Sequence, residues 1–575
     1  MSMFFLTDKI VPQIDPLGAS GFRIPIAFLK DKYNIKKDMS NDLELSKGEN
    51  PLYQAVFNAD DDFKKLTIPQ HATWYTTNKK YLRDTQRILK ENLPIFPLYE
   101  KIMTLRNTNI IPADFIDKYN YIGWDKLHFI NKNSQAMQYM SIYNICSPVL
   151  SLALPFFMLL LPFFIIRLQN NSITWGAYYK HLQIVLRNHS LGQIFFIGSA
   201  TLDKQIMIAV SIIFYLVQVY FNFQSCIKFV KNMIQIHEHV FCVREYLTKT
   251  ITSFESIETN WSVCDTYKPF IDKCSQVRKK ANTICKDLDK ISKLTISFAK
   301  MCDIGQVMRA YYMINTDAEW KETIEFCIYY NSYIHSLHSL KQKLGGEINF
   351  CKYGNNTIFK GLVYPHINFA DAVTNDVAVD KNIIITGPNA AGKTTILKSV
   401  MINVILCQQY GCGYFKKAKL MPYNILSSYI NIPDTSGRDS LFQAEASRCK
   451  AILDDIDSDP NKRHLCIFDE LFSGTNPYEA IGAATAYLNC IGSRNNIQFI
   501  LTTHFLDLCR RLDKNCNVKN MQMQVQDDKK MGFTYTYKMI CGISDVKGGI
   551  KVLKDLGYPE SIIEESSSII ADLKL

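Results

Sequence analysis

Residues 382–398 of this 575-residue chain read NIIITGPNAAGKTTILK, and this stretch decides the fold of the region around it. A β-branched run typical of a buried strand is followed by a loop of the form G-x-x-x-x-G-K-T and by the start of a helix. Gly387 and Gly392 let backbone N–H groups turn inward around phosphates, and the helix N-terminus adds its dipole. Lys393 is expected to reach the β- and γ-phosphates of ATP, and Thr394 to bind Mg²⁺. The other ATP-binding residues expected in the loop are Pro388, Asn389, Ala390, Ala391 and Thr395.

A pair of acidic residues follows a second apolar run, LCIFDE at 465–470. Four apolar residues predict a buried parallel strand, and ligands bind at the carboxyl ends of such strands. Asp469 is expected to hold Mg²⁺, partly through water, and Glu470 to be the general base for the attacking water. An acid pair after a strand is common, so the assignment depends on the phosphate loop.

A third strand is predicted at 497–503, IQFILTT, and it ends at His504. A histidine at the tip of a strand beside the acid pair can sense a γ-phosphate. A histidine at a strand end is more often structural, so this role depends on the other two motifs.

Ser440 precedes a helical pattern that runs through Ile452 and Leu453. A serine at a helix N-terminus is first of all an N-cap. The same geometry also suits donation to a γ-phosphate supplied by a second subunit. Both interpretations stay open.

Two long uncharged runs lie nearer the N-terminus, at 133–166 and 205–227. About 20 apolar residues in a helix span the hydrocarbon of a bilayer. We therefore expect a transmembrane hairpin with spans at about 145–166 and 205–227, flanked by Lys and Arg residues. Prolines at 148, 155 and 162 predict a kinked first helix. The alternative is a pair of central helices buried in an all-helical domain.

The bulk composition is that of a folded protein of several domains, with 47% hydrophobic residues and a net charge of +11. The 17 cysteines lie mostly in apolar runs, which is typical of free thiols in a reducing compartment. We predict four parts: a mainly helical region at 1–135, the hairpin at 136–230, long lever or core helices at 231–345, and an α/β P-loop NTPase domain at 346–575. We expect a membrane protein with its ATPase domain on the cytosolic side, in an organelle that the sequence does not specify.

The run from about Val373 to Ser566 resembles the ATPase domain of the MutS family. The motifs that carry the resemblance are Gly387-Pro388-Asn389, Ser440-x-Phe442-x-x-Glu445, Asp469-Glu470, Ser473-Gly474-Thr475-Asn476-Pro477, Thr502-Thr503-His504 and the terminal segment Gly549–Pro559. The resemblance implies Mg²⁺-dependent ATP hydrolysis by a homodimer whose sites are completed by Ser440 of the other subunit. It also implies that Asn375 lies beside the nucleotide, that Tyr537 lies against adenine, that a terminal helix-turn-helix makes dimer contacts, and that DNA is a candidate partner.

Some family features are missing from the sequence. Ala390 and Ala391 replace the usual loop residues, and we find no Phe-x-Glu mismatch reader in a suitable context. The first hypothesis is therefore a membrane-anchored MutS-like ATPase. The alternatives are a soluble DNA mismatch-recognition ATPase with its apolar runs in a helical core, an ABC-type transporter, and a nucleotide-gated tether that scarcely hydrolyses ATP.

Overall fold

The computed structural model describes residues 21–572, except 109–114, 169–173, 189–191, 200, 293–302, 431, 433–440, 514–516, 529–531 and 547. The chain forms two compact units. The first comprises Met1–Phe96, Thr252–Val277 and Glu325–Leu575, and the second comprises Pro97–Ile251 and Arg278–Ile324. Each unit combines segments that are distant in the sequence, because the units are defined by contacts. They do not test the predicted division of the sequence into four parts, which remains a prediction.

A six-stranded sheet forms the centre of the first unit, in the order β13-β12-β6-β11-β10-β9. Its strands are β6 (Asn382–Thr386), β9 (Ile425–Tyr429), β10 (His464–Asp469), β11 (Ile497–Thr503), β12 (Val518–Asp528) and β13 (Gly532–Cys541). All neighbours are parallel except β12 and β13, which form an antiparallel edge. The strands predicted at 382–386, 465–470 and 497–503 are therefore neighbours, and their carboxyl ends meet at one edge.

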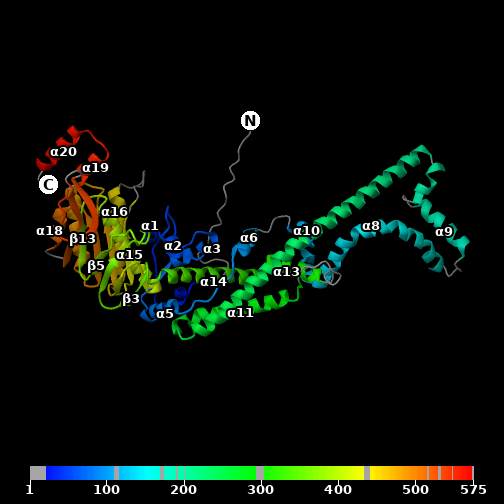
Figure 1. Cartoon of the computed structure of the whole chain (residues 1–575), viewed down its shortest axis with the longest axis horizontal. Helices are drawn as coiled ribbons and strands as arrows, with labels where there is room; N and C mark the ends of the chain where they lie inside the picture. The colour runs from blue at the N-terminus through cyan, green and yellow to red at the C-terminus, as the bar shows by residue number, and fades with distance from the viewer. Residues whose placement is uncertain are drawn as a thin grey trace. The chain divides into compact units, whose positions relative to one another are not determined.

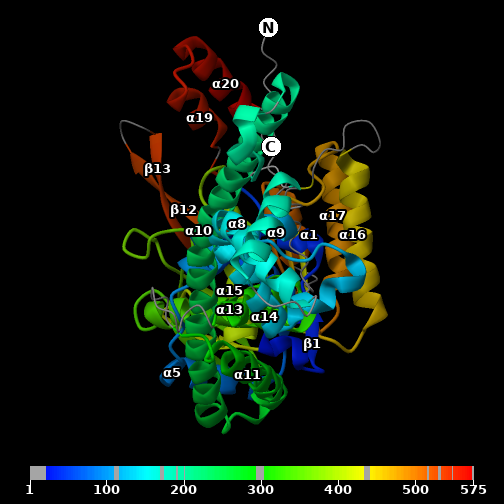
Figure 2. The ribbon, with the colours of Figure 1, turned by 90° about the vertical axis from the view of Figure 1, so that its right-hand side faces the viewer.

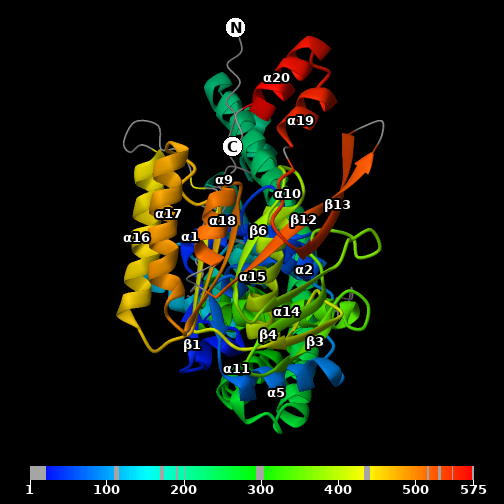
Figure 3. The ribbon, with the colours of Figure 1, turned by 90° about the vertical axis from the view of Figure 1, so that its left-hand side faces the viewer.

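Helices cover both faces of this sheet at β6, β10 and β11, which explains why these strands are mostly apolar without alternation. The helix α15 (Lys393–Tyr410) contacts β10 and β11 on one face. The helices α16 (Leu441–Ser458), α17 (Pro477–Gly492) and α18 (Leu506–Asp513) share one buried core with the other face. Figures 2 and 3 show α16 and α17 side by side.

A five-stranded sheet in the order β5-β4-β8-β3-β7 lies in the same unit. Its strands are β3 (Asn349–Tyr353), β4 (Thr357–Leu362), β5 (Asn375–Val379), β7 (Cys412–Gly413) and β8 (Lys417–Leu420). After the large sheet come α19 (Gly549–Asp555) and α20 (Glu560–Asp572), which pack on each other as a helix pair. The pair matches the position of the terminal helix-turn-helix, and its role in dimer contact remains a prediction.

The N-terminal part of the first unit packs on the α/β region. It consists of η1 (Pro25–Phe28), β1 (Lys32–Asn34), α1 (Lys37–Asp42), α2 (Leu52–Phe57), α3 (Asp62–Lys65), α4 (Ile68–His71), β2 (Trp74–Thr76) and α5 (Lys79–Lys90). Gln408 of α15 donates to the carbonyl of Thr76 at 3.1 Å, and Gln409 donates to that of Trp74 at 2.7 Å. Buried amide side chains thus fix α15 to this N-terminal region. The sequence had not predicted that the two regions pack together.

The second unit is helical. It contains α6 (Glu100–Thr108), α7 (Phe115–Lys118), η2 (Asp125–Lys132), α8 (Ser134–Leu168), α9 (Trp175–Asn188), η3 (Gly192–Ser199) and α13 (Ile304–Thr316). The helices α10 (Leu202–Asn260), α11 (Lys268–Leu288) and α14 (Ala318–Lys343) have residues in both units, and η4 (Asp265–Tyr267) precedes α11. Figure 1 shows α8 as a bowed helix, in keeping with the prolines in its sequence.

Apart from Asn133, the two uncharged runs lie within α8 and α10. Among the described residues, only α10 holds a window long and apolar enough to cross a membrane, with a mean hydropathy of 2.0 and 6% of the window buried. Among the described residues of α8, a shorter apolar stretch is found at Leu159–Leu168. The predicted hairpin of two spans is therefore not supported.

Candidate functional site

The loop between β6 and α15 has the backbone geometry that its glycines permit. Gly387 has a φ of +153° and Gly392 a φ of +93°, which L side chains rarely adopt. A Cβ on Gly387 would also lie 2.9 Å from the Cβ of Met523. Gly392 is the N-cap of α15 and, because it has no side chain, makes no side-chain cap hydrogen bond. The loop is therefore shaped to offer backbone N–H groups to an anion.

Lys393 is the first residue of α15, directly after this loop, and is only 5% exposed. Its Nζ donates to the carbonyl of Gly387 at 2.9 Å and lies 2.8 Å from Nε2 of His504. Burial lowers the pKa of Lys393, and the carboxylates of Glu470 and Asp469 oppose that shift. The ammonium group is thus held where the loop would receive phosphates.

Asp469 and Thr394 meet as the sequence predicts for a Mg²⁺ site. The Thr394 hydroxyl donates to Oδ2 of Asp469 at 2.8 Å, and the Thr502 hydroxyl donates to Oδ1. Mg²⁺ is usually held by one or two carboxylates together with substrate phosphates and water, so this oxygen pair fits it. Across the described residues, no group of three or more His, Cys, Asp or Glu side chains could hold a metal ion by itself.

Glu470 and His504 are in direct contact at the ends of β10 and β11. Nε2 of His504 lies 3.0 Å from Oε1 of Glu470 and 2.7 Å from Oδ1 of Asn389. Oε1 of Glu470 lies 3.7 Å from Nζ of Lys393. The hydrogen bond to His504 lowers the pKa of Glu470 and outweighs the effect of burial. Glu470 is therefore a charged carboxylate at neutral pH, as a general base must be.

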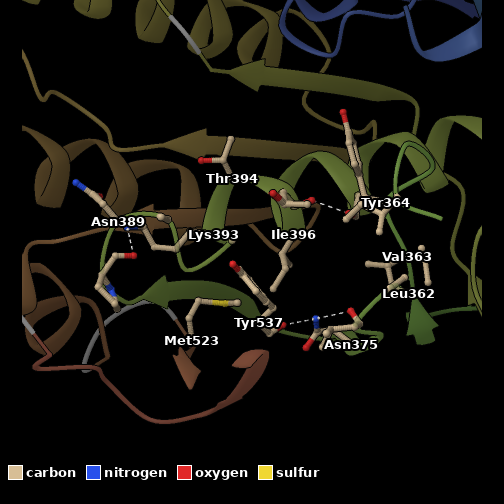
Figure 4. Close-up of a pocket in the computed structure, with 18 of the residues that line it drawn as sticks. Leu362, Val363, Tyr364, Asn375, Asn389, Lys393, Thr394, Ile396, Met523 and Tyr537 are labelled. Atoms are coloured by element: carbon tan, nitrogen blue, oxygen red, sulfur yellow. Dashed lines mark hydrogen bonds between the residues drawn. The ribbon is translucent and has the colours of Figure 1, made fainter. Parts of the chain in front are cut away.

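The loop opens into a cavity of about 470 Å³ (Figure 4). Lys393 and Thr394 lie on one side, and Tyr537 and Met523 lie below them in this view. The amide of Asn375 donates to the carbonyl of Tyr537 at 3.0 Å and accepts from the backbone N–H of Met539 at 2.8 Å. Asn375 thus fixes the strand that carries Tyr537, whose ring is 48% exposed and free to meet a ligand.

The cavity wall also includes residues that the sequence did not single out. They are Leu362, Val363, Tyr364, Ile367, Asp371, Ala372, Ile396, Ser399 and Met523. Most precede β5 in a stretch without a motif, so only the three-dimensional arrangement identifies them. Among the predicted loop residues, Pro388, Asn389, Ala390, Gly392 and Thr395 line the cavity, whereas Ala391 is buried beneath it. Ser440 lies outside the described residues.

The comparison with protein families defines the class of this region. Residues 383–574 match the family model of MutS domain V. The match begins in β6 and includes the phosphate loop, the acid pair, His504 and the terminal helices.

Individual relatives carry names of DNA mismatch repair proteins. The "DNA mismatch repair protein MutS" of Caldicellulosiruptor saccharolyticus is 28% identical over 239 residues, which cover 40% of this chain and 26% of that protein. The "DNA mismatch repair protein MSH2" of Saccharomyces cerevisiae is 30% identical over 206 residues, which cover 33% of this chain and 21% of that protein. The chain thus aligns with about a quarter of its relatives' length. These matches support MutS-family membership and give no support to a transmembrane hairpin.

Proposed function

We propose that this protein is a Mg²⁺-dependent ATPase of the MutS type that works as a homodimer and binds DNA. The observation that carries the proposal is the meeting of Lys393, Glu470 and His504 at the mouth of a glycine loop, beside the Asp469–Thr394 pair. The names of the relatives favour the mismatch-repair alternative over a membrane ATPase. The transporter and the non-hydrolysing tether have no comparable support.

Each residue around the loop has a separate role in the proposed hydrolysis of ATP. The N–H groups of the loop and of α15 bind the phosphates, and Lys393 exchanges its bond to the Gly387 carbonyl for the β- and γ-phosphate oxygens. Thr394 and Asp469 would hold Mg²⁺, which supplies positive charge to the developing negative charge on the phosphates. Glu470 accepts the proton of the attacking water, and His504 holds Glu470 ionised and in place.

Two further roles extend the site beyond this core. The exposed Tyr537 ring stacks on the adenine, while Asn375 fixes the backbone beneath it. Ser440 completes the site of the second subunit, because it directly precedes α16 in the sequence and a helix N-terminus attracts a γ-phosphate. A dimer is therefore needed for full turnover.

The test of the ATPase proposal is phosphate release by the wild-type protein and by Lys393→Ala, measured with Mg²⁺ and again with EDTA. We expect wild-type turnover that requires Mg²⁺ and a fall of at least about a hundredfold in the variant. Lys450→Ala is the matched control, because Lys450 is an exposed lysine that pairs with Asp454 on the outside of α16. Equal activity in Lys393→Ala would rule the site out as the source of turnover.

DNA binding is tested by the affinity for a duplex and for the same duplex with one mismatch, at two salt concentrations. Contacts to phosphates weaken steeply as salt rises. We expect salt-dependent binding and faster ATP turnover with DNA present. Turnover and binding that ignore DNA at low salt would contradict this part of the proposal.

Membrane attachment is a second proposal, based on the exposed apolar surface of α8 and α10. On α10, the side chains of Ile213 and Phe214 are 60% and 69% exposed. The Tyr215 hydroxyl of α10 donates to the backbone carbonyl of Ser151 in α8, and the Asn222 amide donates to the Ser151 hydroxyl, so polar groups meet between the two helices. Covering such a surface with lipid is favourable. The ATPase domain would then face the cytosol, in keeping with its buried, unpaired cysteines.

Extraction from cell membranes tests this second proposal. We expect the wild-type protein to need detergent, and the double variant Ile213→Lys/Phe214→Lys to need less. Val263→Lys is the control, because Val263 is similarly exposed (59%) but lies outside α8 and α10. Release of the wild-type protein by salt alone would contradict membrane attachment and favour the soluble alternative.

A further inference from the structure

The turn after β10 carries Glu470 in an unfavourable backbone conformation. Glu470 has a φ of +51° and Phe472 a φ of +59°, although neither is glycine. Residues with side chains occupy this left-handed region only where their surroundings hold them there. The position of the Glu470 carboxylate therefore depends on what holds this turn.

A buried carboxylate on α16 holds the turn from the other side. Glu445 is 2% exposed, and its Oε1 accepts from the backbone N–H of Ser473 at 3.1 Å and from the Ser473 hydroxyl at 3.0 Å. Its Oε2 accepts from the backbone N–H of Gly474 at 3.1 Å. A Cβ on Gly474 would lie 2.7 Å from Cγ of Leu441, so the turn also packs closely against the start of α16. Three donors on one carboxylate bind the turn and α16 together.

The next turn of α16 is held by the N-terminal segment of the chain. Arg448 donates to the carbonyl of Ser428 at 3.1 Å and to Oδ2 of Asp42 at 3.1 Å, and it forms an ion pair with Asp38. The Ser428 hydroxyl donates to the same Asp42 oxygen at 2.6 Å. The Arg448 and Asp42 side chains are 18% and 12% exposed, so this pair is far less screened than a surface ion pair.

We propose that Glu445 is a positioning residue for Glu470, and that the Asp42–Arg448 pair holds Glu445 in place from the N-terminal segment. The inference rests on the proposed ATPase function and deepens it. Glu445 touches neither the cavity nor Lys393, so it acts on the hydrolytic step through the turn at 470–474. Through the Asp42–Arg448 pair, the N-terminal segment takes part in setting the rate of ATP hydrolysis, although the sequence assigned it no role.

The contact pattern sets the expected effects of two variants. Glu445→Gln keeps the volume but places an amide where a carboxylate accepted N–H groups, so kcat should fall about tenfold while the Kd for ATP changes less than about threefold. Asp42→Asn is further from the turn and should lower kcat about threefold, again with little change in binding. Asp454→Asn, on the exposed side of α16, is the control and should change neither.

The decisive experiment measures single-turnover hydrolysis and the binding of a fluorescent ATP analogue for Glu445→Gln, alone and combined with Glu470→Gln. If Glu445 acts through Glu470, its substitution lowers the rate in the wild-type background and not in Glu470→Gln. An equal loss in both backgrounds, or weaker nucleotide binding in proportion to the lost rate, would overturn the inference. Should Glu445→Gln not fold, as thermal unfolding would reveal, the same comparison is made with Asp42→Asn.

This design separates two kinds of failure. If Glu470→Gln alone hydrolyses ATP at the wild-type rate, Glu470 is not the base and the proposed function of the site is wrong. If Glu470→Gln is slow but neither Glu445→Gln nor Asp42→Asn lowers kcat, the site stands and the positioning role is refuted.

Discussion

Strand β10 and one window of helix α10 are both strongly apolar, yet they lie in opposite environments. The side chains of Leu465, Cys466, Ile467 and Phe468 in β10 are fully buried, between α15 on one face of the sheet and the α16–α17 layer on the other. The apolar window of α10 is only 6% buried within the described chain. The difference is in what covers each element: the chain supplies the cover for β10, and a second molecule or a lipid phase would have to supply it for α10.

The first prediction compares how much β10 and α10 contribute to the free energy of unfolding. Ile467→Ala removes buried atoms from between the sheet and its helices and should lower the free energy of unfolding by about 2–5 kcal/mol. The same substitution at the exposed Ile213 of α10 should change it by less than about 0.5 kcal/mol. Chemical denaturation of both variants in detergent gives the comparison. A large loss at Ile213 would mean that α10 is buried in the folded protein.

A second prediction concerns the loop at the end of the buried strands. Gly387→Ala forces a side chain onto a φ of +153° and against Met523, so about 1–3 kcal/mol of strain should appear, chiefly as weaker ATP binding. Gly482→Ala is the matched control, because a Cβ there, on α17, meets nothing within 4 Å. Titration calorimetry with ATP measures both. Unchanged affinity in Gly387→Ala would show that the loop does not bind phosphates in this conformation.

The smallest expected effect is a pH dependence. The His504 contact lowers the pKa of Glu470, so the ionised carboxylate stabilises the folded state above its unfolded pKa of about 4.3, and this contribution is lost as pH falls through the folded value. The unfolding free energy of wild type relative to Glu470→Gln should therefore shrink as pH falls below about 4, towards the lowered pKa of Glu470. The difference should disappear in the His504→Ala background. A difference that does not shrink below about pH 4 would contradict the assigned contact.

Short-range patterns made the strand, loop and acid-pair positions predictable. The run at 382–398 specified β6, the glycine loop and the start of α15, because each residue type there meets a local backbone or ligand requirement. The strand motifs at Asp469 and His504 then met at one sheet edge, since β10 and β11 are parallel neighbours. Family resemblance added Asn375 and Tyr537, which the structure brings to the same cavity.

Other features depended on contacts between distant segments and were not predictable. The pairing of Arg448 with Asp42, and the amides of α15 bonded to β2, join residues hundreds of positions apart. Hydrophobicity alone also did not predict what surrounds the apolar side chains of α8 and α10. It measures the gain from leaving water and does not specify what provides the apolar surroundings.

The most direct test of the account is the behaviour of Glu470→Gln with ATP and Mg²⁺. We predict that the variant binds ATP as tightly as wild type or more tightly, releases phosphate at least about a hundredfold more slowly, and stays dimeric while ATP is bound. Phosphate release at the wild-type rate would contradict the assignment of Glu470 as the general base, and with it the proposed use of the site.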